Sequence, residues 1–285
     1  MGGKMFSLLT NSSISTGLRA QNLVNKEITE ATQAVSTGRK VRGPLDDPSN
    51  FAISQGLRGE LRAIDAVIQG LNNAKGVVKV GLAGAEATSD IMSDIRKTII
   101  EASNPGITAA QRNILNNDYN NTLQQMRNIL ETSEFNGHNT LIERAIPFNT
   151  FLGQVQDLDV LSNTRGDNFR INGHRLDVVY ARLINEDLND VAGANAALDV
   201  WEANIGFIDS ALGDLGADAR QLKFHTDNLM LLRDEVASGL GNIVDADMAR
   251  AAANLTAAQV KQKLSTETLN ISMSQPKIIQ QLFPK

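Results

Sequence analysis

The stretch that decides the fold is DADMARAAANLTAAQVKQKLSTETLNISMSQPKIIQQLFPK, residues Asp245–Lys285. Its apolar residues recur every three or four positions, which predicts one long helix. Polar Ser, Thr, Asn and Gln fill much of the remainder, so the apolar stripe is thin, and a helix of this kind depends on packing against something else. We therefore expect this helix to need a partner. The stripe changes phase once, since Met248, Ala252 and Leu255 are followed by Val260, Leu264, Ile271, Ile278 and Leu282.

A second thin stripe lies near the other end of the chain, between Asn11 and Arg39. Its apolar positions are Ile14, Leu18, Val24, Ile28, Ala31 and Val35. Gly38 and the Gly43-Pro44 pair end this segment, because proline donates no backbone hydrogen bond and restricts the residue before it. We predict that the two ends of the chain pair with each other.

The composition favours a mostly α protein, since aromatic residues are only 4% of the 285 residues and prolines number 6. A net charge of -5 argues against nucleic acid as a partner, because phosphate binding requires clustered Lys and Arg. The chain has no cysteine, which excludes disulfides and thiolate metal sites. We expect no membrane insertion, because no apolar run is long enough to span a bilayer, and the N-terminal residues lack the apolar core of a cleavable signal peptide.

A long helix is predicted from Pro48, because Asp47 can cap it and proline suits the first helical position. Its apolar residues follow a heptad pattern, which continues in a shifted phase as far as Ile99. Asn104-Pro105-Gly106 then breaks the helix. The capping box Thr108-Ala109-Ala110-Gln111 predicts a third helix that folds back antiparallel on the second.

A fourth helix is predicted from near Ala194, and its heptad pattern continues to Val236. Gly239 and Gly241 predict a looser chain before Asp245, which can cap the final helix.

Two Asn-Gly dipeptides, Asn136-Gly137 and Asn172-Gly173, predict short β-hairpins, because Asn-Gly tolerates the positive φ angles of a type I′ turn. The predicted fold class is therefore mostly α: an antiparallel coiled-coil rod of long helices, with short β-hairpins in the central region.

The sequence offers no constellation for catalysis or for cofactor binding. His138, His174 and His225 fall on three different predicted elements, without the spacing that places two metal ligands on one helical face. Acidic pairs such as Asp157 and Asp159 are more often solvated than catalytic, because acid–base work requires a pocket and a shifted pKa. We expect a protein that is not an enzyme and binds no metal or cofactor.

Several motifs occur in order along nearly the whole chain. The N-terminal part contains Ser7-Leu8-Leu9-Thr10-Asn11, Ser36-Thr37-Gly38-Arg39-Lys40-Val41, Asp46-Asp47-Pro48, Phe51-Ala52-Ile53-Ser54 and Phe135-Asn136-Gly137. The C-terminal part contains Leu215-Gly216, Gln221-Leu222, Asp245-Ala246-Asp247-Met248-Ala249, Gln259, Gln262, Ser274-Gln275-Pro276 and Leu282-Phe283. In these motifs the chain resembles bacterial flagellin.

The resemblance implies a structural subunit that is exported unfolded and polymerises into the bacterial flagellar filament for motility. In that family the two terminal helices are disordered in the free monomer and form the inner core of the filament. Mapped onto this chain, residues 1–43 and 245–285 would be the inner-core helices, 44–142 and 194–244 the two halves of the helical rod, and 143–193 a short β-containing insert. So short an insert is typical of a minimal flagellin with little or no outer variable domain.

The resemblance also implies partners and a location. The partners would be further copies of the chain in a helical homopolymer, the hook-associated junction and cap proteins, a flagellar export chaperone and the secretion apparatus. The expected location is secreted and extracellular, in the filament. A filament grows through open, heterologous contacts, and the residues that we expect in its assembly interface are Ile14, Leu18, Ile28, Val35, Leu255, Leu264, Ile271, Ile278 and Leu282.

Two other functions compete with this interpretation. A hook-filament junction protein is a flagellin relative that forms a few rings, but Asp46-Asp47-Pro48 and the segment Ser274-Gln275-Pro276 through Phe283 are more similar to flagellin proper. A surface-displayed homologue could bind polysaccharide through residues 168–178, although few aromatic side chains are available there to stack on sugars.

One segment departs from the family pattern. The innate receptor of animals that senses flagellin contacts a Gln-Arg-x-Arg-like stretch on the second helix, and Ser93-Asp94-Ile95-Arg96 corresponds to it here. Arg96 keeps the second arginine, whereas Asp94 reverses the charge where the first would donate hydrogen bonds. We predict weak or absent recognition by that receptor.

Overall fold

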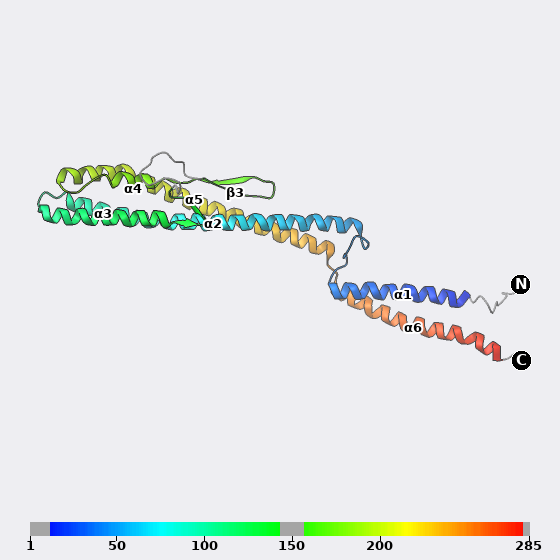
Figure 1. Cartoon of the computed structure of the whole chain (residues 1–285). Helices are drawn as coiled ribbons and strands as arrows, with labels where there is room; N and C mark the ends of the chain where they lie inside the picture. Colours follow the sequence, from blue (N-terminus) through cyan, green and yellow to red (C-terminus); the bar gives the residue numbers. More distant parts are fainter. Residues whose placement is uncertain (1–11, 143–156, 282–285) are drawn as a thin grey trace. The chain divides into compact units, whose positions relative to one another are not determined.

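The computed structural model describes residues 12–142 and 157–281 of the chain (Figure 1). Its elements are α1 (Ser12–Thr37), α2 (Pro48–Ala102), α3 (Ala109–Thr132), β1 (Glu134–Phe135), β2 (His138–Asn139), β3 (Leu158–Leu161), β4 (Asn168–Ile171), α4 (Asp177–Leu183), α5 (Val191–Val244) and α6 (Met248–Gln281). Among the described residues the strands form two antiparallel hairpins, β1-β2 and β3-β4. The predicted class, mostly α with short hairpins, is confirmed.

The chain divides into two compact units, and α2 and α5 contribute residues to both. One unit comprises Met1–Gly59 with Val236–Lys285, and the other is Glu60–Glu235. In the first unit α1 and α6 lie side by side and run antiparallel (Figure 1). The predicted pairing of the two ends is thus present within one chain.

The core of the second unit follows the heptad positions of its long helices. These side chains are fully buried: Ile64, Leu71, Ile95 and Ile99 on α2, Leu123, Met126 and Leu130 on α3, and Ile208, Leu215 and Leu222 on α5. Trp201 of α5 is also buried, and its Nε1 donates a 2.8 Å hydrogen bond to the carbonyl oxygen of Met92 on α2. A buried indole N–H requires such a partner, so Trp201 joins the two long helices by apolar packing and by a hydrogen bond.

Local signals place the break between α2 and α3 where the sequence predicts it. Thr108 caps α3 and forms the expected capping box with Gln111. The buried side chain of Arg112 then reaches back and donates to the carbonyl oxygens of Ala102 and Asn104, both at 3.0 Å. A cation at a helix C-terminus satisfies unpaired carbonyl groups there and complements the helix dipole.

The two Asn-Gly dipeptides have different roles. Asn136 (φ 51°) and Gly137 (φ 84°) do form the turn between β1 and β2. The hairpin predicted at Asn172-Gly173 is wrong, because this dipeptide follows β4 and leads towards α4. Its backbone is fixed by a hydrogen bond from Gly173 N to Oδ1 of Asp157, at 3.2 Å.

The turn that joins β3 to β4 lies at residues 162–167 and contains Gly166 at φ 96°. Asn163 holds this turn, since its Oδ1 accepts from the backbone N–H groups of Arg165 and Asp167. The residues expected to form a returning strand after Gly173 instead form α4, whose Val179, Tyr180 and Leu183 are buried. Burial of three apolar side chains on one helical turn outweighed the local turn signal.

The predicted loosening at Gly239 and Gly241 is also wrong, because α5 is helical without interruption as far as Val244. It also begins at Val191, slightly before the predicted start near Ala194. A helical glycine costs only about 1 kcal/mol relative to alanine.

Three glycines on α2, namely Gly76, Gly81 and Gly84, allow the segment around the first hairpin to approach the helix closely. A Cβ on Gly76 would lie 2.7 Å from the ring of Phe135, and a Cβ on Gly84 would collide with Oγ of Ser133. A Cβ on Gly81 would collide with Oγ1 of Thr140. These positions therefore require glycine for the close approach of another segment.

Candidate assembly site

The terminal helices α1 and α6 bury a narrow seam between them. Its α1 side contains Ile14, Val24, Ile28, Ala31 and Val35, which are half-buried, and its α6 side contains Ala251, Leu255, Ala258 and Leu269. Small residues allow close approach, and a Cβ on Gly17 would lie 2.7 Å from the side chain of Leu269. Among the α6 residues whose side chains are described, 248–274, only Ala251 and Ala258 are buried. The seam therefore buries little apolar area and contributes modest stability.

Polar side chains on α1 and α6 join the two helices at defined positions along the seam. Gln262 Nε2 donates to Oδ1 of Asn25 at 2.9 Å, and Gln21 Nε2 donates to Oγ1 of Thr266 at 3.5 Å. Lys261 pairs with Glu27 at 2.9 Å, but both side chains are about half exposed, so this pair contributes little stability.

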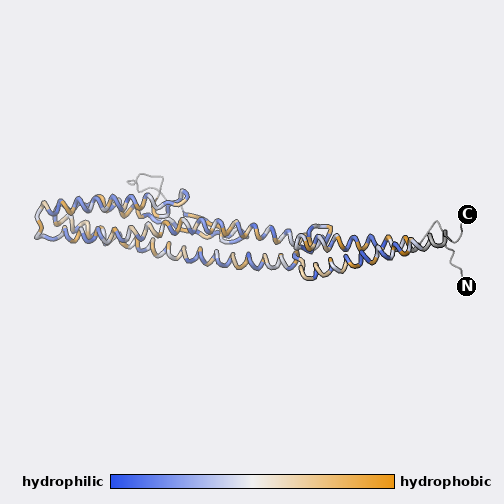
Figure 2. Tube along the Cα trace, turned by 90° about the horizontal axis from the view of Figure 1, so that it is seen from below, coloured by the Kyte–Doolittle hydropathy of each residue, from blue (hydrophilic) through white to orange (hydrophobic). Residues whose placement is uncertain are grey.

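A second apolar face of α6 lies away from α1, and we call its described residues Val260, Leu264 and Ile271 the outer stripe. Their exposed fractions are 53%, 59% and 64%. At about 100° per residue they lie on roughly the opposite side of the helix from Ala251, Ala258 and Leu269. The phase change in the sequence thus separates two faces, one that contacts α1 and one that has no cover in the single chain. Figure 2 shows hydrophobic and hydrophilic residues interspersed along both terminal helices.

The nine residues selected from the sequence fall into three groups. Ile14, Ile28, Val35 and Leu255 lie in the seam within the chain. Leu18, Leu264 and Ile271 are exposed, at 52%, 59% and 64%. Ile278 and Leu282 lie outside the residues whose side chains are described. The apolar pattern of the sequence does not distinguish the first two groups. Ala258 and Leu269 were not predicted, although the phase change was a signal for both.

The segment that follows α1 contacts the segment that leads into α6. We call these two segments the joint and define it as residues 38–47 with 241–250. The backbone N–H groups of Lys40 and Val41 both donate to the carbonyl oxygen of Val244, at 2.8 and 3.3 Å. Ala246 N donates to the carbonyl oxygen of Gly38 at 2.8 Å, next to an antiparallel bridge between Arg39 and Asp245. The ends of α1 and α6 are therefore held together by backbone hydrogen bonds.

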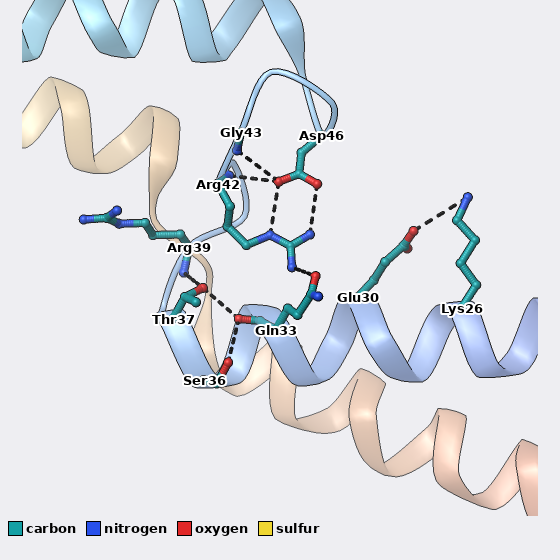
Figure 3. Close-up of polar contacts among 9 residues, drawn as sticks. All are labelled: Lys26, Glu30, Gln33, Ser36, Thr37, Arg39, Arg42, Gly43 and Asp46. Carbon is teal, nitrogen blue, oxygen red and sulfur yellow. Dashed lines mark hydrogen bonds and ion pairs between the residues drawn. The ribbon is translucent and has the colours of Figure 1, made fainter.

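Asp46 forms the centre of a side-chain clamp in the joint (Figure 3). Its carboxylate accepts from Nε and Nη2 of Arg42 at 3.1 and 3.0 Å, and from the backbone N–H groups of Arg42 and Gly43. Arg42 Nη1 also donates to Oε1 of Gln33 on α1. The hydrogen bonds from the Arg42 side chain and backbone lower the pKa of Asp46 from its usual 3.8. Asp46 therefore ties the loop to the end of α1 as a carboxylate.

A groove of about 990 Å³ runs along the joint and the adjoining parts of α1 and α6. Its walls include cations and anions, among them Lys26, Glu30, Arg39, Arg250 and Asp247. Figure 3 shows Lys26 and Glu30 next to each other on α1, an exposed pair at 3.8 Å. The mixed charge makes this groove a solvated polar surface.

The histidines do not form a metal site. His138 lies in β2, His174 in the loop after β4, and His225 in α5 beside the ring of Phe169. Burial lowers the pKa of His174, and Asp214 opposes this shift. Over residues 12–142 and 157–281, no group of His, Asp or Glu residues could hold a metal ion. In the same ranges no helix is both long and apolar enough to cross a membrane.

Ser93, Asp94 and Arg96, in the segment that we expect to correspond to the receptor epitope, are exposed on α2, whereas Ile95 between them is buried. The guanidinium carbon of Arg96 lies 4.9 Å from the ring centroid of Trp201, so the arginine takes part in a cation–π contact within the chain. Asp94 is exposed and its carbonyl oxygen accepts a hydrogen bond from Thr98.

The chain matches two family models that together span most of its length. The bacterial flagellin N-terminal helical region matches residues 8–144, and the bacterial flagellin C-terminal helical region matches residues 198–283. Among solved structures, Bacillus cereus flagellin has a TM-score of 0.50 at 20% identity, covering 56% of this chain and 88% of that one. A putative flagellar hook-associated protein from Vibrio parahaemolyticus has a TM-score of 0.61 at 13% identity, covering 70% and 100%. At these sequence identities the two structural similarities establish a shared fold and do not establish a shared function.

Curated relatives extend the similarity over nearly the whole chain. Flagellin FljK of Caulobacter vibrioides is 25% identical over 284 residues, which cover 97% of this chain and 98% of the relative. A flagellin of Brucella melitensis is 25% identical over 293 residues, with 98% and 99% covered.

Two paired terminal helices attached to long heptad helices define a helical structural subunit. The chain belongs to the bacterial flagellin family and is a structural subunit of the flagellar filament. The junction and polysaccharide-binding alternatives are not favoured.

Proposed function

We propose that the subunit assembles through the outer stripe of α6, which packs against other copies while the opposite face of α6 stays on α1. The observation that supports this is the pair of apolar faces on one helix, of which the chain covers only one. Exposed apolar surface drives association because its removal from water is favourable. Leu18, beside the seam on α1, is proposed to enlarge the same contact.

In this proposal the expected segments have distinct roles. Residues 1–43 and 245–285 form the inner core of the filament, and residues 44–142 and 194–244 the helical layer around it. Residues 143–193 are a short insert. The seam residues Ile14, Ile28, Val35 and Leu255 hold the helix pair together within each subunit, whereas Leu18, Leu264 and Ile271, with Ile278 and Leu282, contact neighbours.

The remaining roles follow from membership of a structural family. We propose that the subunit is secreted through the flagellar export apparatus with the help of an export chaperone, and that it contacts the junction and cap proteins of the filament. Its activity is mechanical, with no catalytic step or cofactor.

The test is polymerisation of purified subunits that carry Leu264→Ser and Ile271→Ser. Each serine removes apolar surface worth about 1.5–3 kcal/mol if that surface is buried on assembly, so each should raise the critical concentration by roughly tenfold or more. Pelleting and electron microscopy of seeded samples measure it. Ile114→Ser is the matched control, since Ile114 is 68% exposed on α3. Unchanged assembly of the α6 variants, or an equal loss with Ile114→Ser, would contradict the proposal.

A further inference from the structure

Two backbone hydrogen bonds hold the residues between β4 and α4 against the residues that follow β2. The N–H of His174 donates to the carbonyl oxygen of Thr140 at 2.7 Å, and the N–H of Leu176 donates to that of Leu141 at 2.9 Å. Both leucine side chains are buried. We call residues 172–176 the latch segment. It is docked in the second unit, between the β3-β4 hairpin and α4.

This docked segment encloses polar atoms that the described residues leave unsatisfied. Nε2 of His174 and Oγ1 of Thr140 are both buried, and neither has a hydrogen-bond partner in residues 12–142 and 157–281. Thr140 is only 3% exposed, and its hydroxyl faces Gly81 of α2, where a Cβ would collide with Oγ1. Buried polar groups are normally paired, so each exception requires an explanation. Here the described part of the chain offers no acceptor for a proton on Nε2.

The charges that act on the His174 imidazole lie on α5. They come from Asp214, while Asp218 lies one turn further along the same helix and is itself influenced by Asp214. The contacting residues of α2 and of the β2 side named above are a glycine and a threonine, which carry no charge. Within the latch segment the cation is Arg175, which pairs with Asp177 at 2.8 Å. Burial lowers the pKa of His174, and the attraction of Asp214 only partly opposes this effect.

From this enclosure we propose that His174 is a pH-sensitive latch: its neutral imidazole keeps the latch segment docked on α2 and α5, and its protonation releases the segment. A neutral imidazole has one N–H group, whereas the imidazolium has an N–H at both nitrogens. Protonation in the docked state would therefore bury a charge and an N–H donor at Nε2, and both are costly without a partner. Release exposes the imidazolium to water. The latch does not depend on assembly through α6.

The direction of the pH dependence follows from the burial of the imidazole. In the docked state the pKa of His174 lies below its ordinary 6.5. The contribution of the neutral ring to docking is fully present above pH 6.5 and is lost as the pH falls through the lowered value. The release is local, because Val179 and Leu183 of α4 are buried and the Tyr119 hydroxyl donates to the carbonyl oxygen of Leu183 at 2.7 Å. Acid therefore loosens the link between hairpin and α4 while α4 stays on α3.

The first test follows the full-length subunit from about pH 8 to about pH 5, which brackets the ordinary histidine pKa. NMR of the labelled imidazoles measures the pKa of His174, and hydrogen–deuterium exchange with mass spectrometry measures the protection factors of the latch segment. We expect a pKa below 6.5, and protection that falls by up to about tenfold for each unit by which that pKa is lowered. Peptides of α2 should keep their protection. A pKa at or above the ordinary value, or constant protection of the latch segment, would overturn the inference.

The second test uses variants of the same subunit. His174→Gln keeps a polar side chain that does not titrate, so protection of the latch segment should become independent of pH. His225→Gln, at a half-buried position on α5, is the matched control and should retain the dependence. The inference is overturned if His174→Gln retains the dependence or if His225→Gln abolishes it.

Variants of the two carboxylates keep the inference testable even if His174→Gln does not fold. Asp214→Asn removes the attraction that opposes burial, so it should lower the pKa of His174 further and enlarge the loss of protection in acid. Asp218 has a raised pKa, because of its burial and of Asp214, and so titrates with the opposite effect on stability. Asp218→Asn should therefore leave the acid-induced release in place. An unchanged or raised pKa of His174 in Asp214→Asn, or loss of the release in Asp218→Asn, would overturn the inference.

Discussion

Gln262 on α6 donates a hydrogen bond from Nε2 to Oδ1 of Asn25 on α1, at 2.9 Å, along the exposed edge of a thin apolar seam. Gln21 and Thr266 form a second polar contact, which lies closer to the two chain termini. Apolar residues alone tolerate sliding of one helix along another, whereas a polar pair is satisfied in one register only. We infer that these side chains set the register of α1 against α6.

Replacing the pair with Asn25→Leu and Gln262→Leu should add apolar contact but allow a slipped register. The chain has no cysteine, so any disulfide forms between introduced cysteines and reports which positions lie together. In filaments, Gln21→Cys should form a disulfide with Thr266→Cys in the parent protein. In the double leucine variant it should also cross-link to Gln259→Cys, one heptad away. Asn22→Leu, at an exposed position on α1, is the control, and a single register in the double variant would contradict the role of the pair.

The close approach at Gly84 predicts a large effect of one methyl group. Gly84→Ala places a Cβ against Ser133 and Leu141, and overpacking of this kind costs about 1–3 kcal/mol. Gly70→Ala, also on α2, has no atom within 4 Å of the new Cβ and should gain up to about 1 kcal/mol from helix propensity. Chemical denaturation of the two variants measures both free energies of unfolding. Equal effects would show that the close approach is not required.

Local signals accounted for the elements that depend on short-range chemistry. Asp47 and Pro48 start α2, the capping box at Thr108 starts α3, and the Asn136-Gly137 turn is present. The signal at Asn172-Gly173 failed because burial of α4 supplies more free energy than a turn preference. The signal at Gly239 failed because a helical glycine costs only about 1 kcal/mol, which does not by itself end a helix.

The assembly site was predictable in part. The sequence indicated which residues of α1 and α6 are apolar, but the partner of each apolar face depends on the pairing of segments more than 200 residues apart, such as Gln21 with Thr266. The clamp at Asp46 was not predicted either, because its contacts with Arg42 and Gln33 depend on how the loop returns to α1.

The clamp predicts a specific dependence on acid. The folded-state pKa of Asp46 lies below the usual 3.8, so its contribution to stability is fully present above about pH 4 and is lost as the pH falls through the lowered value. Asp46→Asn should destabilise the pairing of α1 and α6 at neutral pH, and the acid-induced loss should become shallower than in the parent. Circular dichroism of thermal unfolding at a series of pH values measures both changes. Asp234→Asn, which removes an exposed carboxylate outside the joint, should leave the acid profile unchanged, and an identical change there would assign it to net charge.

The exposed carboxylate of Asp94 predicts poor recognition by the innate receptor that senses flagellin. The neighbouring cation, Arg96, is engaged over the ring of Trp201, so the surface presents a negative charge where an arginine would donate hydrogen bonds, and like or unpaired charges at an interface are costly. Purified subunits should activate receptor reporter cells weakly, and Asp94→Arg should raise the response by about tenfold or more. Asp90→Arg makes the same charge change one turn earlier on the exposed surface of α2 and should leave the response low. Strong activation by the unmodified subunit, or an equal gain with Asp90→Arg, would show that Asp94 does not control recognition.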